Sequence, residues 1–501
     1  MAAISKLRLD STLAHLKSPD GCPVLLGGSP LRLLRLRPPA DDLVDALRRN
    51  ASVESALSAL DPQRRNAGRR FLATLVQRGL AHPVPRPDAT RALTDVTIVI
   101  PVHNRPVALT RLLAALRPLT ARGARVLVVD DGSNDGTGSV AVGAGVRVVR
   151  RATPHGPAAA RNAGLAQVET AVVAFLDSDT VPSDGWLDTC LSHLDDTTGV
   201  DGLGPVDVVA PRIISATLNA NVPRTLTKLI RAYEGARSPL NLGADPALVT
   251  PMTRVAYVPA AALVCRTAAV RQVGAFDESL TVGEDVDLMW RLVGNGNVVR
   301  YEPLAEVAHD DRIDPGAFVR RRFQYGTSAA LLDRRHPGLV PPAVVSPWSA
   351  IAVAAAGFGV PGVLAGTAMA AATTAALPRK LRQLMPADAR RLAWRGHTAA
   401  IEQMAMATTR TWFPAAVVVA LASKRMRLFV IASAVIPGLL EHHRLQPKLG
   451  RLSFVALRVI DDAAYGCGVW VGSIRAHSVG ALVPRIQNWP GRRSVSEDTK
   501  R

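Results

Sequence analysis

Two aspartates that directly follow an apolar run form the part of this sequence with the clearest chemistry. The run Val172-Val173-Ala174-Phe175-Leu176 is followed by Asp177-Ser178-Asp179, which places two carboxylates at the end of an expected strand. Paired carboxylates supply hard oxygen ligands, which suit Mg²⁺ or Mn²⁺ already carrying phosphate oxygens. Because Asp-x-Asp is also frequent in solvated turns, the pattern alone leaves both interpretations open.

Similar polar clusters follow two apolar runs further upstream. One run ends at Pro101-Val102, directly before His103 and Asn104, and the next ends at Val129, directly before Asp130 and Asp131. A carboxylate at such a position can accept a hydrogen bond from the N–H of a base such as uracil. It can equally cap a helix or form an Asx turn.

An arginine and a pair of acids complete the candidate groups. Arg161 follows a stretch of small residues and can offer a fork of donors to a diphosphate, although a surface helix arginine is the commoner case. Glu284 and Asp285 begin an amphipathic pattern, where carboxylates favour a helix N-terminus. In a cleft, one of them could take a proton from an acceptor hydroxyl. His309 ends a short expected strand and could be a third metal ligand.

These groups are positioned by an alternation of strands and helices. Apolar runs at residues 96–102, 126–129, 146–149 and 172–176 alternate with helical patterns at residues 106–117, 134–144 and 157–167. Continuous apolar strands separated by helices predict a mostly parallel sheet that is buried on both faces, the α/β class. Ligands of such sheets bind beyond the carboxyl ends of the strands, where every cluster named above falls.

The order and spacing of these motifs resemble the family 2 glycosyltransferases, which have a GT-A fold with a Rossmann-like, mostly parallel sheet. The resemblance covers about residues 94–324. The matching segments are Val99-Ile100-Pro101-Val102-His103-Asn104, Val128-Val129-Asp130-Asp131-Gly132-Ser133, Ala160-Arg161-Asn162-Ala163-Gly164, Phe175-Leu176-Asp177-Ser178-Asp179 and Gly283-Glu284-Asp285.

The resemblance implies an inverting transfer from a UDP-sugar. Asp179 would hold a divalent metal, with Asp177 beside it. Asp285 would be the general base, with Glu284 as the less favoured candidate. Asp131 would bind the uracil, and the residues implied near the nucleotide are Pro101, His103, Asn104, Asp130, Arg161 and Asp177. The QxxRW motif of processive synthases is absent, and residues 320–326 stand in its place.

The net charge of +19 is distributed unevenly over the 501 residues. Residues 379–501 hold 20 Lys and Arg against 7 Asp and Glu, beside the most apolar sequence of the chain. Basic flanks on apolar helices favour contacts with anionic lipid headgroups, and no zinc-finger or RNA-binding signature points to nucleic acid. The four scattered cysteines predict reduced thiols, and the first residues lack the apolar core of a signal peptide.

Three apolar segments are candidates for membrane contact. Residues 337–378 contain no charged residue and no histidine, and could form one tilted helix, a hairpin of two helices or a buried Ala-rich hairpin. The runs at residues 411–423 and 428–440 are each too short to span, which favours interfacial or re-entrant helices. We therefore expect a helical, partly membrane-embedded region at 336–445, followed by a basic tail at 446–501. The expected location is the cell membrane, with the catalytic domain on the cytoplasmic side.

A small N-terminal unit, residues 1–88, precedes the catalytic region at 94–335. A hairpin with a Gly-Gly turn and three helical patterns predict a winged-helix-like module that resembles the PqqD-like peptide-binding fold; a plain structural cap is the alternative. The three-part arrangement is similar to the mycofactocin-system members of the glycosyltransferase family. It implies that β-1,4-linked glucose units are added to premycofactocin, a peptide-derived redox cofactor precursor. The alternatives are a lipid or cell-wall glycan acceptor and, outside enzymes, a peptide- or nucleic-acid-binding scaffold.

Overall fold

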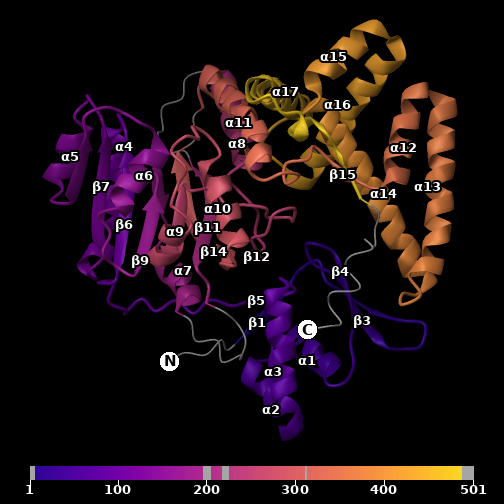
Figure 1. Cartoon of the computed structure of the whole chain (residues 1–501), viewed down its shortest axis with the longest axis horizontal. Helices are drawn as coiled ribbons and strands as arrows, with labels where there is room; N and C mark the ends of the chain where they lie inside the picture. Colours follow the sequence, from indigo (N-terminus) through magenta and orange to yellow (C-terminus); the bar gives the residue numbers. More distant parts are fainter. Residues whose placement is uncertain (1–5, 196–204, 217–224, 311–312, 488–501) are drawn as a thin grey trace. The chain divides into compact units, whose positions relative to one another are not determined.

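The computed structural model describes residues 6–195, 205–216, 225–310 and 313–487 (Figure 1). The chain divides into two compact units. Unit 1 comprises residues 1–16, 22–220 and 237–311, and unit 2 comprises residues 17–21, 221–236 and 312–501. Residues 312–335, which we expected to close the catalytic region, therefore belong to unit 2.

The described part of unit 1 contains a nine-stranded mixed sheet. Four neighbouring strands, β9-β6-β7-β8, run parallel, as the apolar runs predicted. β13 pairs antiparallel with both β9 and β11, while β11 runs parallel to β14 and β10 runs antiparallel to it. The strands are β6 (Val96–Val102), β7 (Arg125–Asp131), β8 (Arg147–Arg151), β9 (Val172–Leu176), β10 (Thr180–Pro182), β11 (Val208–Ala216), β12 (Ala247–Leu248), β13 (Ala262–Arg266) and β14 (Val299–Asp310). This is the GT-A architecture that the motif order implied.

Helices cover both faces of this sheet. Ile98 and Ile100 of β6 pack in one cluster with α4 and α7, whereas Val99 packs in the other with α6 and α10. Successive residues of a strand point to opposite faces, so a strand buried on both sides is apolar throughout. All seven residues of β6 are buried. The helices are α4 (Pro106–Ala121), α5 (Thr137–Gly143), α6 (Pro157–Leu165), α7 (Trp186–Leu194), α9 (Thr267–Gln272) and α10 (Glu284–Gly294).

The N-terminal residues form a hairpin and three helices around their own core, as expected. β3 (Pro23–Gly27) pairs antiparallel with β4 (Arg32–Arg35), and β1 (Leu7–Leu9) pairs with β5 (Ala81–Pro83). Leu25, Leu43 and Leu72 lie in the buried cluster that these elements share. The remaining elements are β2 (Ala14–Lys17), α1 (Ala40–Arg48), α2 (Val53–Ser58) and α3 (Pro62–Gln77). Its likeness to a winged helix or a PqqD-like fold stays a prediction. All four cysteines of the chain are free thiols.

Unit 2 is largely helical. Its elements include α8 (Thr225–Arg237), α11 (Pro315–Arg335), α12 (Pro347–Ala355), η1 (Ala356–Phe358), α13 (Val360–Lys380), α14 (Pro386–Thr409), α15 (Phe413–Ala422), α16 (Lys424–Leu445), α17 (Arg451–Ala476), η2 (Gly480–Leu482) and the strand pair β15 (Val344–Val345) and β16 (Arg485–Ile486). α12 and α13 run side by side as a hairpin (Figure 1). The segment expected as a basic tail contains α17, which packs along α11, and its last residues, 488–501, lie outside the described part.

In the part of unit 2 that the structure describes, two helices are long and apolar enough to cross a membrane. They are α13, with a mean hydropathy of 1.4, and α16, with 1.2, and little of either helix is buried in the protein. α14 and α15 meet at an 84° bend and could form a third, broken span. The expectation that residues 428–440 are too short to span was wrong. The Lys424–Arg427 segment, which lies between the two apolar runs, is the first turn of a 22-residue helix.

α11 and α17 approach each other closely at glycines. A methyl group on Gly326 would overlap the carbonyl oxygen of Tyr465, and one on Gly468 would overlap that of Phe323. Gly472 meets the carbonyl oxygen of Thr327 in the same way. Small residues allow two helix backbones to come this near, so these three positions set the helix spacing.

Candidate functional site

The Asp-x-Asp motif lies between two strands of the sheet and faces a histidine. β10 starts at Thr180, directly after Asp179, and pairs with β14 so that Thr180 lies opposite His309. Asp179 Oδ1 is 3.5 Å from His309 Nε2, and their side chains are 16% and 6% exposed. Strand register therefore brings together two candidate metal ligands, Asp179 and His309, that lie far apart in the sequence.

The first aspartate of the motif has a different partner. Asp177 Oδ1 accepts a hydrogen bond from Arg161 Nη2 at 2.7 Å, and Arg161 Nη1 donates to Glu284 Oε1 at 3.0 Å. Arg161 is buried and stacks over the Phe276 ring, with its guanidinium carbon 5.3 Å from the ring centroid. Its partners in the structure are these two carboxylates; the expected contact with a diphosphate stays a prediction.

The acidic pair sits at the first turn of α10. Gly283 precedes the helix with φ +86°, a conformation that favours glycine, and this turn brings Glu284 and Asp285 to the helix N-terminus. Asp285 Oδ1 accepts from the N–H of Val286 at 2.8 Å, and Oδ2 accepts from that of Ala260 at 3.3 Å. These contacts orient the Asp285 carboxylate, while Glu284 is held by Arg161.

Burial raises the pKa values of both acids of this pair. Burial, together with the neighbouring charge of Asp285, raises the pKa of Glu284 to about 7, against a smaller opposite effect of Arg161. The pKa of Asp285 is also raised, mainly by burial, while the hydrogen bond from Val286 N–H and the charge of Arg161 lower it. With a pKa of about 7, Glu284 can exchange a proton near neutral pH, and groups with perturbed pKa values are frequent at functional sites.

The predicted nucleotide-binding residues gather at the carboxyl ends of β6 and β7. His103 Nδ1 lies 2.8 Å from the carbonyl oxygen of Asp131, and Asn104 N–H donates to Ser133 Oγ at 3.0 Å. Asp130 is fully buried and accepts from Ser133 N–H at 2.9 Å, so it holds the turn. Pro101 lies one residue before the end of β6.

Asp131 has partners that the sequence analysis missed. Its carboxylate accepts from the backbone N–H groups of His155 and Gly156, at 3.0 and 2.8 Å, and lies 3.2 Å from Arg151 Nε. β7 and β8 pair in a register that places Asp131 opposite Arg151. Arg150 and Arg151, which follow the expected strand at 146–149, were the sequence feature that could have indicated this ion pair. These contacts fix residues 151–156 beside Asp131.

Few side chains of the site are placed to bind a metal ion. Within the part of the chain that the structure describes, no three His, Cys, Asp or Glu side chains are grouped to hold an ion. Asp179 and His309 provide one carboxylate and one imidazole nitrogen, with Asp177 turned to Arg161. This set fits Mg²⁺ or Mn²⁺ that fills its other positions with water and phosphate oxygens.

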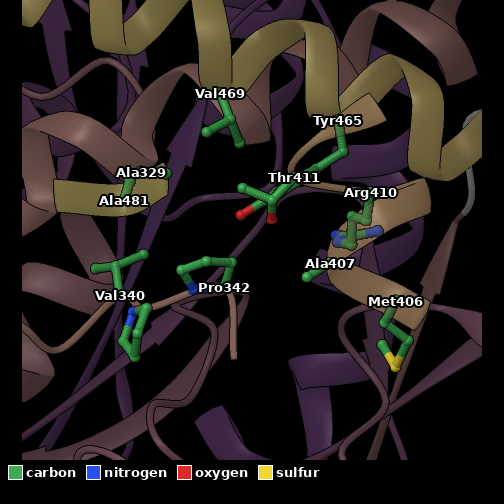
Figure 2. A pocket seen from close by; sticks show the side chains of 11 residues that line it. Ala329, Val340, Pro342, Met406, Ala407, Arg410, Thr411, Tyr465, Val469 and Ala481 are labelled. Carbon is green, nitrogen blue, oxygen red and sulfur yellow. The ribbon is translucent and has the colours of Figure 1, made fainter. Parts of the chain in front are cut away.

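Unit 2 contains a separate pocket of about 220 Å³ (Figure 2). Its walls include Val340, Pro342 and Val469, with polar groups from Arg410 and Thr411. None of the predicted site residues lines it. The Arg410 guanidinium stacks 3.8 Å from the ring centroid of Tyr465 and pairs with Asp462 at 2.9 Å, so its charge is already balanced.

Comparisons with known proteins agree with the fold and the motifs. Residues 97–234 match the family model "Glycosyl transferase family 2", and residues 172–437 match "Glycosyl transferase family group 2". The chain is 39% identical over 477 residues to the pre-mycofactocin glycosyltransferase of Mycobacterium tuberculosis (strain ATCC 25618 / H37Rv), covering 92% of this chain and 94% of that protein. It is 29% identical to the succinoglycan biosynthesis protein ExoU of Rhizobium meliloti, over 41% of this chain and 58% of that protein.

A mannosyltransferase of Pyrobaculum calidifontis, solved in complex with GDP-Man and Mn²⁺, is 17% identical with a TM-score of 0.37, over 81% of this chain and 98% of that one. At that score the likeness bears on no detail of the site. The family models and the near full-length similarity are sufficient: the chain belongs to the family 2 glycosyltransferases, and it is an enzyme that transfers a sugar.

Proposed function

We propose that this enzyme transfers glucose from UDP-glucose to premycofactocin and extends it as a β-1,4-linked chain. The acceptor is supported by the M. tuberculosis relative, whose name states it and whose similarity runs over nearly all of both chains. The observation that supports this chemistry is that Arg161 bridges the two groups of candidate residues. It donates to Asp177, next to Asp179 and His309, and to Glu284, next to Asp285.

In this proposal the donor lies along the carboxyl ends of β6, β7 and β9. Asp131 binds the uracil, with Pro101, His103, Asn104 and Asp130 shaping the surrounding loops. Asp179 and His309 hold Mg²⁺ or Mn²⁺, with Asp177 as a supporting residue. A bound metal supplies positive charge that stabilises the departing UDP.

Asp285 is the proposed general base. Its carboxylate is oriented by two backbone N–H groups, and it takes the proton of the acceptor hydroxyl as that oxygen attacks the anomeric carbon from the side opposite UDP. This in-line attack inverts the anomeric configuration. Glu284 is the weaker candidate because Arg161 already occupies one of its oxygens.

A panel assay tests donor and acceptor together. Full-length enzyme is incubated with several UDP-sugars and either premycofactocin or lipid-linked acceptors, and the products are identified by mass spectrometry. We expect glucosylated premycofactocin with the native enzyme and none with Asp285→Asn, which should still bind UDP. Transfer only to the lipid-linked acceptors would reject the proposed acceptor in favour of the second candidate.

That second candidate, a lipid or cell-wall glycan acceptor, rests on the apolar helices of unit 2. α13 and α16 could bring the enzyme to a membrane where such acceptors reside. In both cases we propose that the enzyme sits at the cell membrane with its catalytic domain on the cytoplasmic side. Extraction of membranes with alkaline carbonate tests insertion, and release of the protein into the supernatant would reject it.

For residues 1–88 we propose recognition of the peptide-derived acceptor. The support is their separate core and their hairpin, which resembles the PqqD-like peptide-binding fold. Deletion of these residues should raise the acceptor KM and leave the donor KM unchanged. An unchanged acceptor KM in a folded deletion variant would leave them as a structural cap.

A further inference from the structure

Two turns of unit 2, more than sixty residues apart in sequence, lie side by side. One joins α12 to α13 through η1 and Gly359, and the other joins α15 to α16. η1 packs against α16, and a methyl group on Gly357 would lie 3.5 Å from the sulfur of Met426. We call the residues exposed on both turns the tip cluster: Phe358, Val360, Leu421, Lys424, Arg425, Arg427 and Leu428.

The apolar members of the tip cluster are unusually exposed. Phe358 and Leu421 are each 75% exposed, Val360 is 72% exposed and Leu428 is 62% exposed. Single exposed apolar side chains are ordinary on protein surfaces, but here four lie on two neighbouring turns. Each such side chain gains free energy on leaving water, so a partner that buries them together is favoured.

The same turns carry an uncompensated positive charge. Lys424, Arg425 and Arg427 are exposed, and among the described residues Lys424 and Arg425 make no ion pair or side-chain hydrogen bond. Residues 341–440 hold ten Lys and Arg but two acids. Both acids are already paired, Asp388 with Arg391 and Glu402 with Arg444. Within residues 341–440, both acids are therefore engaged by arginines outside the tip cluster.

We propose that the tip cluster docks on anionic lipid headgroups, with its four apolar side chains entering the upper acyl region of the bilayer. Exposed apolar side chains together with cations match a surface with negative headgroups above hydrocarbon. A polyanion such as a nucleic acid would use the cations and leave the apolar side chains in water. The proposal rests on the membrane association proposed above, to which it adds a dependence on lipid charge.

Vesicle flotation of the full-length protein tests this docking. Phosphatidylcholine vesicles are compared with vesicles that also contain phosphatidylglycerol, using native protein, Lys424→Glu/Arg425→Glu/Arg427→Glu and Phe358→Ser/Leu421→Ser. Arg64→Glu/Arg70→Glu, at two exposed positions of α3, is a control for a loss of positive charge elsewhere on the protein. Circular dichroism confirms that each variant folds.

We expect the triple charge reversal to weaken binding to the anionic vesicles at least about a hundredfold, since each cation contributes roughly fivefold at such a surface. The Phe358/Leu421 variant should bind both kinds of vesicle more weakly, and the α3 control should behave like native protein. Equal binding of the charge-reversal and native proteins would overturn the proposal. The proposal would also be overturned if the charge-reversal variant alone lost binding to single-stranded DNA while its binding to vesicles stayed unchanged.

The two proposals fail in distinguishable ways. Carbonate release of the native protein rejects membrane insertion, while charge-dependent flotation can still hold for a peripheral protein. Sugar transfer to a soluble acceptor, measured without vesicles, should be the same for the native and tip-cluster variants, because none of these residues lies in the proposed site.

Discussion

Two regions of this protein use the same pairing of arginine and carboxylate in different ways. At the site in unit 1, one buried arginine, Arg161, binds Asp177 and Glu284, and the neighbouring acids Asp179 and Asp285 stay partly exposed. In unit 2, Asp461 and Asp462 are buried and paired with several arginines. Arg322 lies 3.0 Å from Asp461, and Arg410 and Arg458 lie 2.9 and 3.5 Å from Asp462.

The difference shows which charges are available for chemistry. In unit 2 the network extends further: Tyr233 donates to Asp461 at 3.0 Å, Glu234 pairs with Arg322, and Glu441 lies 2.7 Å from Arg458. Such mutual pairing offsets the cost of burying ions and ties α8, α11, α14, α16 and α17 together. In unit 1 the arginine satisfies only one member of each acidic pair. The other member keeps a carboxylate that a ligand can reach.

Removing a proposed metal ligand should give the largest difference between the two regions, because it should affect activity and not stability. Asp179→Ala should lower kcat/KM by more than about a hundredfold, because a direct ligand should cost more than a supporting one. The melting temperature should change little, since the side chain is not part of a core. Product formation and thermal unfolding are measured together, with Asp184→Ala as an exposed control. Full activity in a folded Asp179→Ala protein would remove Asp179 from the metal site.

Arg161 should link the two acidic pairs. Arg161→Met leaves Asp177 and Glu284 without their shared cation, and we expect a roughly ten- to hundredfold loss in kcat, as for a supporting residue of a metal site. Arg161→Lys keeps the charge but cannot bridge both carboxylates, so its loss should be partial. If both variants fold and turn over like native enzyme, the bridge is only structural.

In unit 2 the same kind of substitution should affect folding. Asp462→Ala removes a buried carboxylate that pairs with both Arg410 and Arg458. We expect a loss of about 3–5 kcal/mol in the free energy of unfolding. Urea unfolding of this variant, beside Asp462→Asn as the isosteric control, gives the measurement. UDP binding by the fraction that stays folded should be unchanged. A stability within error of native would show that the network is not stabilising.

The pKa of Glu284 predicts a pH dependence of a definite sign. The folded pKa of about 7 lies above the ordinary value near 4.5, so the native state binds more protons than the unfolded state between these values. Stability from this group is fully present below about pH 4.5 and is lost as pH rises through about 7. Glu284→Gln should flatten that fall, as measured by urea unfolding from pH 4.5 to 8. If stability fell with pH as steeply in Glu284→Gln as in native protein, the fall would not come from Glu284.

The smallest effect should come from an exposed pair on the surface of unit 2. Arg444 lies 2.8 Å from Glu402, with the side chains 60% and 43% exposed. Arg444→Ala should change the free energy of unfolding by less than about 1 kcal/mol, because solvent screens the pair. A cost similar to that of Asp462→Ala would mean that burial is not what separates strong from weak pairs in this unit.

What could be read from the sequence was set by local patterns. β9 ends at Leu176 as predicted, because an unbroken apolar run leaves few alternatives for a strand buried on both faces. α16 was expected to begin only at residue 428, because the charged residues Lys424, Arg425 and Arg427 precede the apolar run. In the structure Ser423 accepts from the N–H of Met426 and starts the helix there.

The pairings within the site depend on tertiary structure and left no local signal. Arg161 and Glu284 are 123 residues apart, and only the packing of α6 and α10 on the same face of the sheet brings them together. The same is true of Arg322 and Arg410, which reach Asp461 and Asp462 from other segments, whereas Arg458 lies four residues before Asp462 in α17. Sequence patterns identified the residue types at the strand ends, whereas the choice of partner required the fold.

The glycines between α11 and α17 have a consequence for how this enzyme can change over evolutionary time. Alanine is usually the mildest replacement in a helix, and in isolation it would favour helix formation over glycine at Gly326, Gly468 and Gly472. Here each added methyl group would meet an opposing carbonyl oxygen, so the mildest replacement already separates the helices. In a saturation-mutagenesis library, these three positions should tolerate a single amino acid, while the longer side chains around them vary.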